Sequence, residues 1–286
     1  MTLHEATFFL LNKLRSMYDE GEAAAITDRV MEHLTGSGKT ERMLYKHSVI
    51  TGEEEQQLQD YTRRLLNLEP VQYVLGETWF AGLKFRVNPQ VLIPRPETEE
   101  LVEWVLSNCV TFTGESLTIL DIGTGSGCIP VTLKKRFSKA HIHSCDISAA
   151  AVDTARQNAK ELGTAISFHV LDFLDPLTWE SLPDAGIIVS NPPYIPASGS
   201  KEMHDNVLRF EPHQALFVPD EDPLLFYRAI AGFSRQKLNP GGMIFLEIHE
   251  DLGTAVTELF NRQGYHTTRR KDMQGKDRMV RAVKGD

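Results

Sequence analysis

Apolar residues in the first 70 positions recur at the spacing of helices that share a core. One such stripe contains Leu10 and Leu14, and a later one contains Leu58 and Leu65. The run 51–54, Thr-Gly-Glu-Glu, fits a capping box, in which a threonine hydroxyl and a glutamate carboxylate satisfy backbone N–H groups at a helix start. Thr27 and Asp28 are also predicted to cap a helix. The pattern therefore predicts an N-terminal helical domain over residues 1–70.

The pattern changes after Pro70. Apolar residues then alternate around Gly82, from Trp79 to Val87, which is typical of a short hairpin. Two prolines in the segment 92–98 exclude a helix there, and a new helix is expected from about Thr98. Residues 71–97 are thus predicted to form a hairpin linker.

From residue 117 onward, short apolar runs alternate with helical patterns. Such alternation indicates a parallel sheet covered by helices on both faces. The predicted class is α/β, with a Rossmann-like domain over residues 98–286. The expected strands are 117–121, 141–146, 166–170, 186–190 and 243–247, followed by a closing hairpin of 265–271 and 278–283.

A glycine-rich run follows the first of these strands at residues 121–127. Its G-x-G-x-G spacing differs from the G-x-G-x-x-G of dinucleotide-binding loops. Glycine lets the backbone turn tightly and approach a ligand, although a tight strand–helix crossover also favours glycine. We interpret the run as a loop for the methionine part of S-adenosylmethionine (SAM). The expected cofactor-binding residues in it are Gly123, Thr124, Gly125, Ser126 and Gly127.

Acidic and aromatic residues end the next two strands. Asp146 is placed to accept both hydroxyls of a ribose, as an acid about 20 residues beyond a glycine loop does. Asp172 is placed to accept a hydrogen bond from the amino group of adenine, and Phe173 is placed to stack on the adenine ring. An ordinary turn with a core aromatic is the alternative for the second pair. Together, the glycine-rich run, Asp146 and the pair Asp172–Phe173 are predicted to bind one adenosyl ligand along one edge of the sheet.

The fourth strand ends in Asn191-Pro192-Pro193-Tyr194. An amide nitrogen is a poor nucleophile because its lone pair is delocalised into the carbonyl. The Asn191 side-chain oxygen and the Pro192 carbonyl can accept the two N–H bonds of a planar NH₂ group, and Tyr194 offers it a flat face. The prolines stiffen the loop. This motif predicts catalytic Asn191, Pro192 and Tyr194 and a substrate loop that includes Pro193, without choosing among adenine, guanine and glutamine.

Composition narrows the expected partners. The chain of 286 residues has a net charge of −9, and neither residues 1–70 nor the remainder is basic, so no direct contact with nucleic acid is expected. No apolar run reaches the roughly 20 residues that span a membrane. The three cysteines lack a CxxC spacing and the histidines lack a metal spacing, so a cytoplasmic protein without metal is expected. No spare apolar helix face is evident, which favours a monomer.

The chain resembles the release-factor glutamine methyltransferases over nearly its whole length. The resemblance is carried by residues 70–76, 80–85, 121–127 and 191–194 and, above all, by Pro-Arg-Pro-Glu-Thr-Glu-Glu-Leu-Val at 94–102. It implies a helical domain that helps to bind the release factor and a seven-stranded SAM-dependent methyltransferase domain. It also implies that Asn191 contacts SAM as well as the substrate. The implied substrate is the Gln of the Gly-Gly-Gln motif in bacterial class 1 release factors, which becomes N5-methylglutamine.

Three positions depart from the family pattern. His249 stands where glycine is usual, Leu252 where glutamine is usual, and 219–223 where a glycine turn is typical. The nearest rival is an adenine-N6 or guanine-N2 nucleic-acid methyltransferase, which needs a basic groove and base-flipping elements. A non-catalytic SAM-binding module would leave Asn191 dispensable, and a dehydrogenase would need a different glycine spacing.

Overall fold

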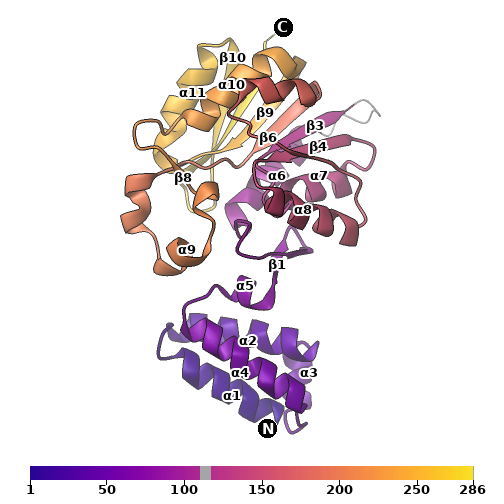
Figure 1. Cartoon of the computed structure of the whole chain (residues 1–286), viewed down its shortest axis with the longest axis vertical. Coiled ribbons are helices and arrows are strands. Elements are labelled where there is room, and N and C mark those ends of the chain that lie inside the picture. Colours follow the sequence, from indigo (N-terminus) through magenta and orange to yellow (C-terminus); the bar gives the residue numbers. More distant parts are fainter. Residues whose placement is uncertain (110–116, 286) are drawn as a thin grey trace. The chain divides into compact units, whose positions relative to one another are not determined.

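The structure is a computed structural model that describes residues 1–109 and 117–285. Residues 110–116 and 286 fall within the predicted domain 98–286 but lie outside the described residues. The chain divides into two compact units. The first comprises Met1–Glu77 and His204–Phe210, and the second comprises Thr78–Met203 and Glu211–Asp286 (Figure 1).

The first unit is helical. Its apolar stripes meet in one core that includes Leu10, Leu14, Leu58 and Leu65, none of which is exposed. Burying such a side chain contributes about 1.5–3 kcal/mol, so the core holds helices that would be marginal alone. Its helices are α1 (Leu3–Leu14), α2 (Glu20–Thr35), α3 (Lys39–Leu44), α4 (Gly52–Leu66), α5 (Val71–Leu75) and α9 (Asp205–Phe210).

Helix starts in this unit follow the capping signals only in part. The capping box at Thr51 is confirmed, because its hydroxyl accepts from the Glu54 N–H at 3.1 Å. The predicted cap at Thr27 and Asp28 is wrong, because α2 begins earlier, after Asp19. Thr27 instead lies inside α2 and its hydroxyl donates to the Ala23 carbonyl at 2.7 Å. Three consecutive alanines favour helix through this stretch, so the helix continues past both residues.

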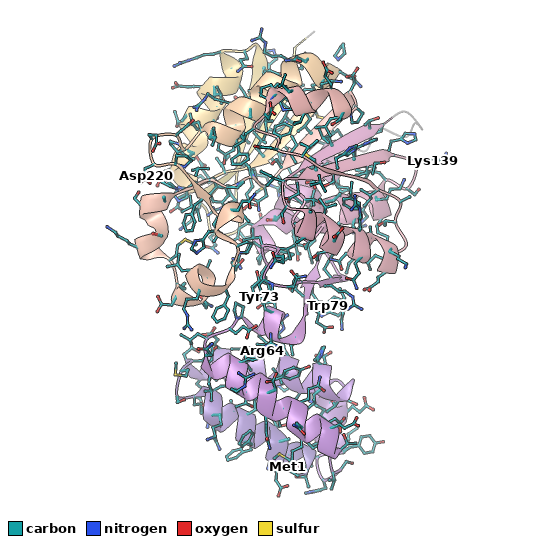
Figure 2. The ribbon with its side chains drawn as sticks, in the orientation of Figure 1. Met1, Arg64, Tyr73, Trp79, Lys139 and Asp220 are labelled. Carbon is teal, nitrogen blue, oxygen red and sulfur yellow. The ribbon has the colours of Figure 1, made fainter. Side chains whose placement is uncertain are left out.

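Arg64 ties the short helix α5 to α4 (Figure 2). Its guanidinium donates to the carbonyls of Tyr73 and Val74, each at 3.0 Å, and pairs with Glu69. A basic side chain that bonds the last carbonyls of a helix satisfies groups that have no partner within the helix. A five-residue helix can therefore persist here.

The second unit is built on a seven-stranded sheet of described residues with the order β10-β11-β9-β6-β3-β4-β5. Strands β3, β4, β5, β6 and β9 pair in parallel, whereas β10 and β11 form an antiparallel hairpin at one edge. The strands are β3 (Thr118–Ile122), β4 (His141–Asp146), β5 (Ser167–Val170), β6 (Ala185–Ser190), β9 (Leu238–Glu247), β10 (Tyr265–Lys271) and β11 (Asp277–Lys284).

Helices cover both faces of this sheet (Figure 1). Alternate residues of β6 point to opposite faces, so that Ile187 and Val189 join one apolar cluster and Ile188 joins the other. Helices α6 (Pro96–Asn108), α7 (Cys128–Arg136) and α8 (Ala149–Glu161) contribute to the first cluster. Helices α10 (Leu225–Lys237) and α11 (Gly253–Asn261) contribute to the second.

The predicted α/β class and the seven-stranded sheet are confirmed. The predicted strand ends are within one residue of the observed ones, except that β9 begins at Leu238, five residues before its predicted start. The hairpin after Pro70 appears as β1 (Glu77–Phe80) and β2 (Leu83–Arg86). Short elements escaped sequence reasoning because they carry too few residues to show a period. They are β7 (Ile195–Pro196), β8 (Phe217–Val218), η1 (Pro176–Ser181), η2 (Ala197–Glu202), η3 (His213–Ala215) and η4 (Glu250–Leu252).

Asn158 of α8 joins the hairpin to the glycine-rich loop. Its amide nitrogen donates to the carbonyls of Ser126 and Arg86, both at 2.9 Å, and its oxygen accepts from the Arg86 N–H at 2.7 Å. The side chain is buried, so losing any of these bonds would leave a buried polar group without a partner. One side chain thus fixes β2 and the loop after β3 to the same helix.

Gly127 begins α7 where α7 packs against α8. Its φ is +80°, and a Cβ atom at this position would lie 3.0 Å from the Cβ of Ala155. We expect Gly127→Ala to lower the free energy of unfolding by roughly 2–4 kcal/mol, from backbone strain and steric overlap together. Urea unfolding of the full chain measures the change.

Gly163 provides the matched control. It also has a positive φ, +62°, but a Cβ there would meet nothing within 4 Å. Gly163→Ala should therefore cost only the strain, about 1 kcal/mol. In the Gly127→Ala background, Ala155→Gly should restore part of the loss, and equal costs at the two glycines would contradict the packing argument.

Candidate active site

A cavity of about 410 Å³ lies in the second unit at the carboxyl ends of the central strands. The loop after β3 and the loop after β6 both line it. These two strands are neighbours whose following helices cover opposite faces of the sheet, so their loops diverge and leave a crevice. This is the position at which open α/β sheets bind ligands.

The glycine-rich loop forms one wall of the cavity. Gly123, Gly125 and Gly127 have φ values of +83°, +50° and +80°, a region that side chains other than glycine rarely adopt. The N–H groups of Gly123 and Thr124 both donate to the Cys145 carbonyl, at 2.9 and 3.0 Å. The cavity is lined in this loop by Gly123, Thr124, Gly125 and Ser126, whereas Gly127 packs against α8.

Asp146 holds the glycine-rich loop to the end of β4. Its carboxylate accepts from the Gly125 N–H at 3.0 Å and from the Ser148 N–H at 2.9 Å. Burial raises the pKa of Asp146, and the N–H bonds from Ser148 and Gly125 oppose that rise. Since a carboxylate has about four lone-pair sites, further acceptor capacity remains toward the cavity, which Asp146 lines.

Asp172 and Phe173 line the same cavity. Asp172 is exposed, and its carboxylate accepts from the Leu174 N–H at 2.9 Å. Phe173 is buried, with its ring 5.8 Å from that of Trp179 and 5.3 Å from that of Phe233. The Phe173 ring therefore belongs to the core and borders the cavity at the same time.

Asn191, Pro192 and Pro193 also line the cavity. Ser190 anchors the start of this segment, because its hydroxyl donates to the Ile122 carbonyl at 2.7 Å. The Asn191 side-chain nitrogen donates to the Thr98 hydroxyl at 3.0 Å. The structure thus brings the two predicted loops together around one space.

Tyr194, predicted to offer a flat face to the substrate, has a buried partner for its hydroxyl. It is absent from the described residues that line the cavity, and its hydroxyl donates to Glu247 at 3.1 Å. Burial and the neighbouring Glu247 carboxylate raise the pKa of the Tyr194 phenol. The hydroxyl is therefore placed as a hydrogen-bond donor and not as a base.

Four residues at the site have no individual role predicted from the sequence. Arg95 and Thr98 line the cavity, and Glu211 and Glu247 are hydrogen-bonded to them in turn. Arg95 pairs with Glu211, whose buried carboxylate also accepts from the Ile93 N–H at 3.2 Å. Glu247 ends the buried strand β9 and is itself only 1% exposed. A glutamate at the end of an otherwise apolar strand was the available signal, because buried acids need partners.

The positions that depart from the family pattern occupy the loop after β9 and the segment before α10. The His249 ring lies 6.1 Å from that of Tyr194, and its Nδ1 atom accepts from the Asp251 N–H at 3.3 Å. Leu252 packs against the core. Asp220 accepts from the Ser198 N–H at 2.8 Å (Figure 2).

Residues 1–109 and 117–285 also bear on the expectations about metal ions and membranes. Within these residues, no group of three or more histidine, cysteine, aspartate or glutamate side chains is arranged to hold a metal ion. No helix in the same residues is long and apolar enough to span a membrane.

This sheet, with a glycine-rich loop and an Asn-Pro-Pro-Tyr loop around one cavity, is that of the methyltransferase class. The sequence model described as methyltransferase small domain matches residues 101–210, and the one described as PrmC N-terminal domain matches residues 4–76. A methyltransferase structure from Pyrococcus furiosus has a TM-score of 0.50 and 18% identity over 72% of this chain and 91% of its own, which shows the shared fold.

Curated relatives define the family. A release factor glutamine methyltransferase from Flavobacterium psychrophilum is 39% identical over 94% of this chain and 94% of its own length. One from Bacteroides thetaiotaomicron is 37% identical over 98% of this chain and 99% of its own. The chain belongs to the release factor glutamine methyltransferase family, as the sequence resemblance predicted.

Asp121, under the glycine-rich loop, makes a testable contribution to the pH dependence of stability. Burial raises the pKa of its fully buried carboxyl to about 7. The folded state therefore binds a proton more tightly than the unfolded state, and stability falls as pH rises through this pKa. We expect Asp121→Asn to flatten that fall in urea unfolding followed from pH about 4 to about 8.

Ser144→Ala should act in the opposite direction. The Ser144 hydroxyl donates to Asp121 at 2.6 Å and lowers the pKa of the carboxyl. Its removal should move the fall in stability to higher pH. Identical pH profiles for the wild type and both variants would show that Asp121 does not titrate in this range.

Proposed function

We propose that this protein transfers a methyl group from SAM to the side-chain amide nitrogen of a glutamine. The glutamine is that of the Gly-Gly-Gln motif in bacterial peptide chain release factors. Family membership supports the reaction and the substrate class. The observation that carries the proposal is the placement of Asp146, at the end of β4, and Asn191, after β6, in the lining of one cavity.

The residues at the cavity suit SAM as the methyl donor. Asp146 has acceptor capacity left for ribose hydroxyls, and Asp172 and Phe173 supply an acceptor and an apolar wall for adenine. The backbone at Gly123 and Gly125 has positive φ values, which favour glycine. Because glycine has no Cβ atom, a ligand can approach the backbone closely at these two positions. When bound, SAM supplies an electrophilic methyl group on a sulfonium centre.

The loop 191–194 suits a planar amide as the acceptor. The Asn191 nitrogen is engaged by Thr98, so its side-chain oxygen is available to accept one substrate N–H. Proline has no N–H, and the Pro192 carbonyl can accept the other substrate N–H. Orienting the amide in this way can supply roughly 7–11 kcal/mol of the barrier, which a weak nucleophile requires.

We further propose the N-terminal helical region, residues 1–70, as a docking domain for the release factor, with 71–97 as the linker to the methyltransferase domain over 98–286. A recognition domain separate from the cavity suits a substrate that is a folded protein and not a small molecule. Deleting a docking domain should raise KM for the intact release factor more than for a short Gly-Gly-Gln peptide.

Labelled SAM provides the direct test of substrate. The purified protein is incubated with a bacterial class 1 release factor and, separately, with tRNA, rRNA and duplex DNA, and peptide mass spectrometry locates the added methyl group. We expect the methyl on the glutamine of Gly-Gly-Gln. Label on nucleic acid alone would retain the fold and the loop chemistry but refute the protein substrate.

Two substitutions should separate chemistry from cofactor binding. Asn191→Ala removes the acceptor for the substrate amide, so we expect methyl transfer to fall roughly 100-fold or more while the Kd for SAM changes only a few-fold. Asp146→Ala should instead raise the Kd for SAM at least about 10-fold, since it removes charge-assisted hydrogen bonds. Calorimetry and single-turnover rates measure the two effects, and turnover at the wild-type rate in Asn191→Ala would refute the role of the loop.

A further inference from the structure

A buried hydrogen-bond chain lies beside the cavity. The Glu247 carboxylate accepts from the Thr98 hydroxyl at 2.7 Å and from the Tyr194 hydroxyl at 3.1 Å. Thr98 in turn accepts from the Asn191 side-chain nitrogen at 3.0 Å. The Glu247 carbonyl accepts from the Tyr227 hydroxyl at 3.1 Å, which holds the backbone of the glutamate as well. Glu247 and Thr98 are 1% and 2% exposed, so no bulk water replaces these partners.

The direction of each bond follows from the donors available. An ionised carboxylate only accepts, so the single hydroxyl proton of Thr98 goes to Glu247. The Thr98 oxygen is then left to accept, and only the NH₂ side of the Asn191 amide can donate to it. The amide of Asn191 has nearly the same shape when rotated by 180°, so nothing within Asn191 itself selects this orientation.

We propose that Glu247 is a positioning residue for methyl transfer. Through Thr98 it turns the oxygen of Asn191 toward the substrate amide, and through Tyr194 it holds the other end of the same loop. The inference rests on the proposed function for its substrate, but the hydrogen-bond chain is a property of the protein alone.

Glu247 links this orientation to pH. Burial raises its pKa to about 7, while the hydrogen bonds from Thr98 and Tyr194 oppose the rise. A protonated Glu247 can donate to Thr98, whose own proton then points to Asn191 and favours the rotated amide. The titratable and charged groups that face Glu247 from the surrounding elements are Glu97 on α6, Cys128 on α7, Tyr194 on the loop, Tyr227 on α10 and Arg278 on β11.

When the Asn191 amide is rotated, its NH₂ group faces the NH₂ group of the substrate, and the two groups cannot form a hydrogen bond that orients the substrate. We therefore expect the single-turnover rate to rise with pH through about 7, as Glu247 loses its proton. The rate should fall as pH drops below this value. Asp121 has a pKa in the same range, so a variant must assign the midpoint to one of the two acids.

Thr98→Val and Thr98→Ser form the first test. Valine keeps the shape of threonine but removes the hydroxyl, whereas serine retains it. At saturating SAM and release factor, we expect the single-turnover rate of Thr98→Val to fall roughly 10- to 100-fold, with the Kd for SAM within about 2-fold of wild type. Thr98→Ser should stay within about 3-fold. A Thr98→Val rate equal to wild type would overturn the proposal.

Tyr194→Phe tests the titration. It removes a hydrogen bond that lowers the pKa of Glu247 and does not touch Asp121, so the midpoint of the pH–rate profile should move upward. A midpoint that stays in place would show that Glu247 does not set the profile.

Infrared spectroscopy reads the same titration without any substrate. The difference between wild type and Glu247→Gln isolates the carboxyl band of Glu247, whose midpoint should lie near 7 and shift upward in Tyr194→Phe. An unshifted band overturns the inference even if no methyl transfer is found. Absence of methyl transfer to the release factor by the wild type, with the expected band shift, would instead refute only the proposed function.

Discussion

The parallel register around β3 is the constraint on which the site depends. Asp121 and Ile122 lie opposite Val189 and Ser190 of β6 on one side, and β4 pairs along the other side. Parallel strands in this register end together, so the loops that follow them emerge at one edge. A shift of one residue in β6 would exchange its side chains between the two apolar clusters and would displace Asn191 relative to the glycine-rich loop.

Acids are buried beside residues that line the cavity. Asp121, Glu211 and Glu247 are 0%, 4% and 1% exposed, and each accepts at least one hydrogen bond from a neighbouring element. A buried acid without such bonds would be costly, so each one constrains the groups around it. The walls of the cavity are thereby held by directed bonds as well as by apolar packing, which suits a reaction that depends on orientation.

Sequence patterns could predict the sheet and the two loops, and all of the predicted site residues except Gly127 and Tyr194 line the cavity in the described chain. They succeed because strands of the βαβ type carry apolar runs and the loops carry glycine and proline at fixed places. They could not reveal the bond between Thr98 and Glu247, since the two residues lie 149 positions apart and neither is unusual locally. Tyr194 shows the same limit, because its residue type gave no sign that the fold directs its hydroxyl to a buried acid. The error at Thr27 has a local cause, in that helix propensity continued through a residue that elsewhere would cap a helix.

The bonds of Asn158 have a consequence for local opening of the chain. Its side chain accepts the Arg86 N–H and binds the Ser126 carbonyl, so an amide proton in the hairpin and the backbone of the glycine-rich loop share one anchor. Hydrogen exchange at a buried amide requires a local opening that breaks such an anchor. A ligand that stabilises the glycine-rich loop should therefore slow deuterium uptake at Arg86, although Arg86 itself does not line the cavity in the described chain. That single amide would then report occupancy of the cavity from outside it.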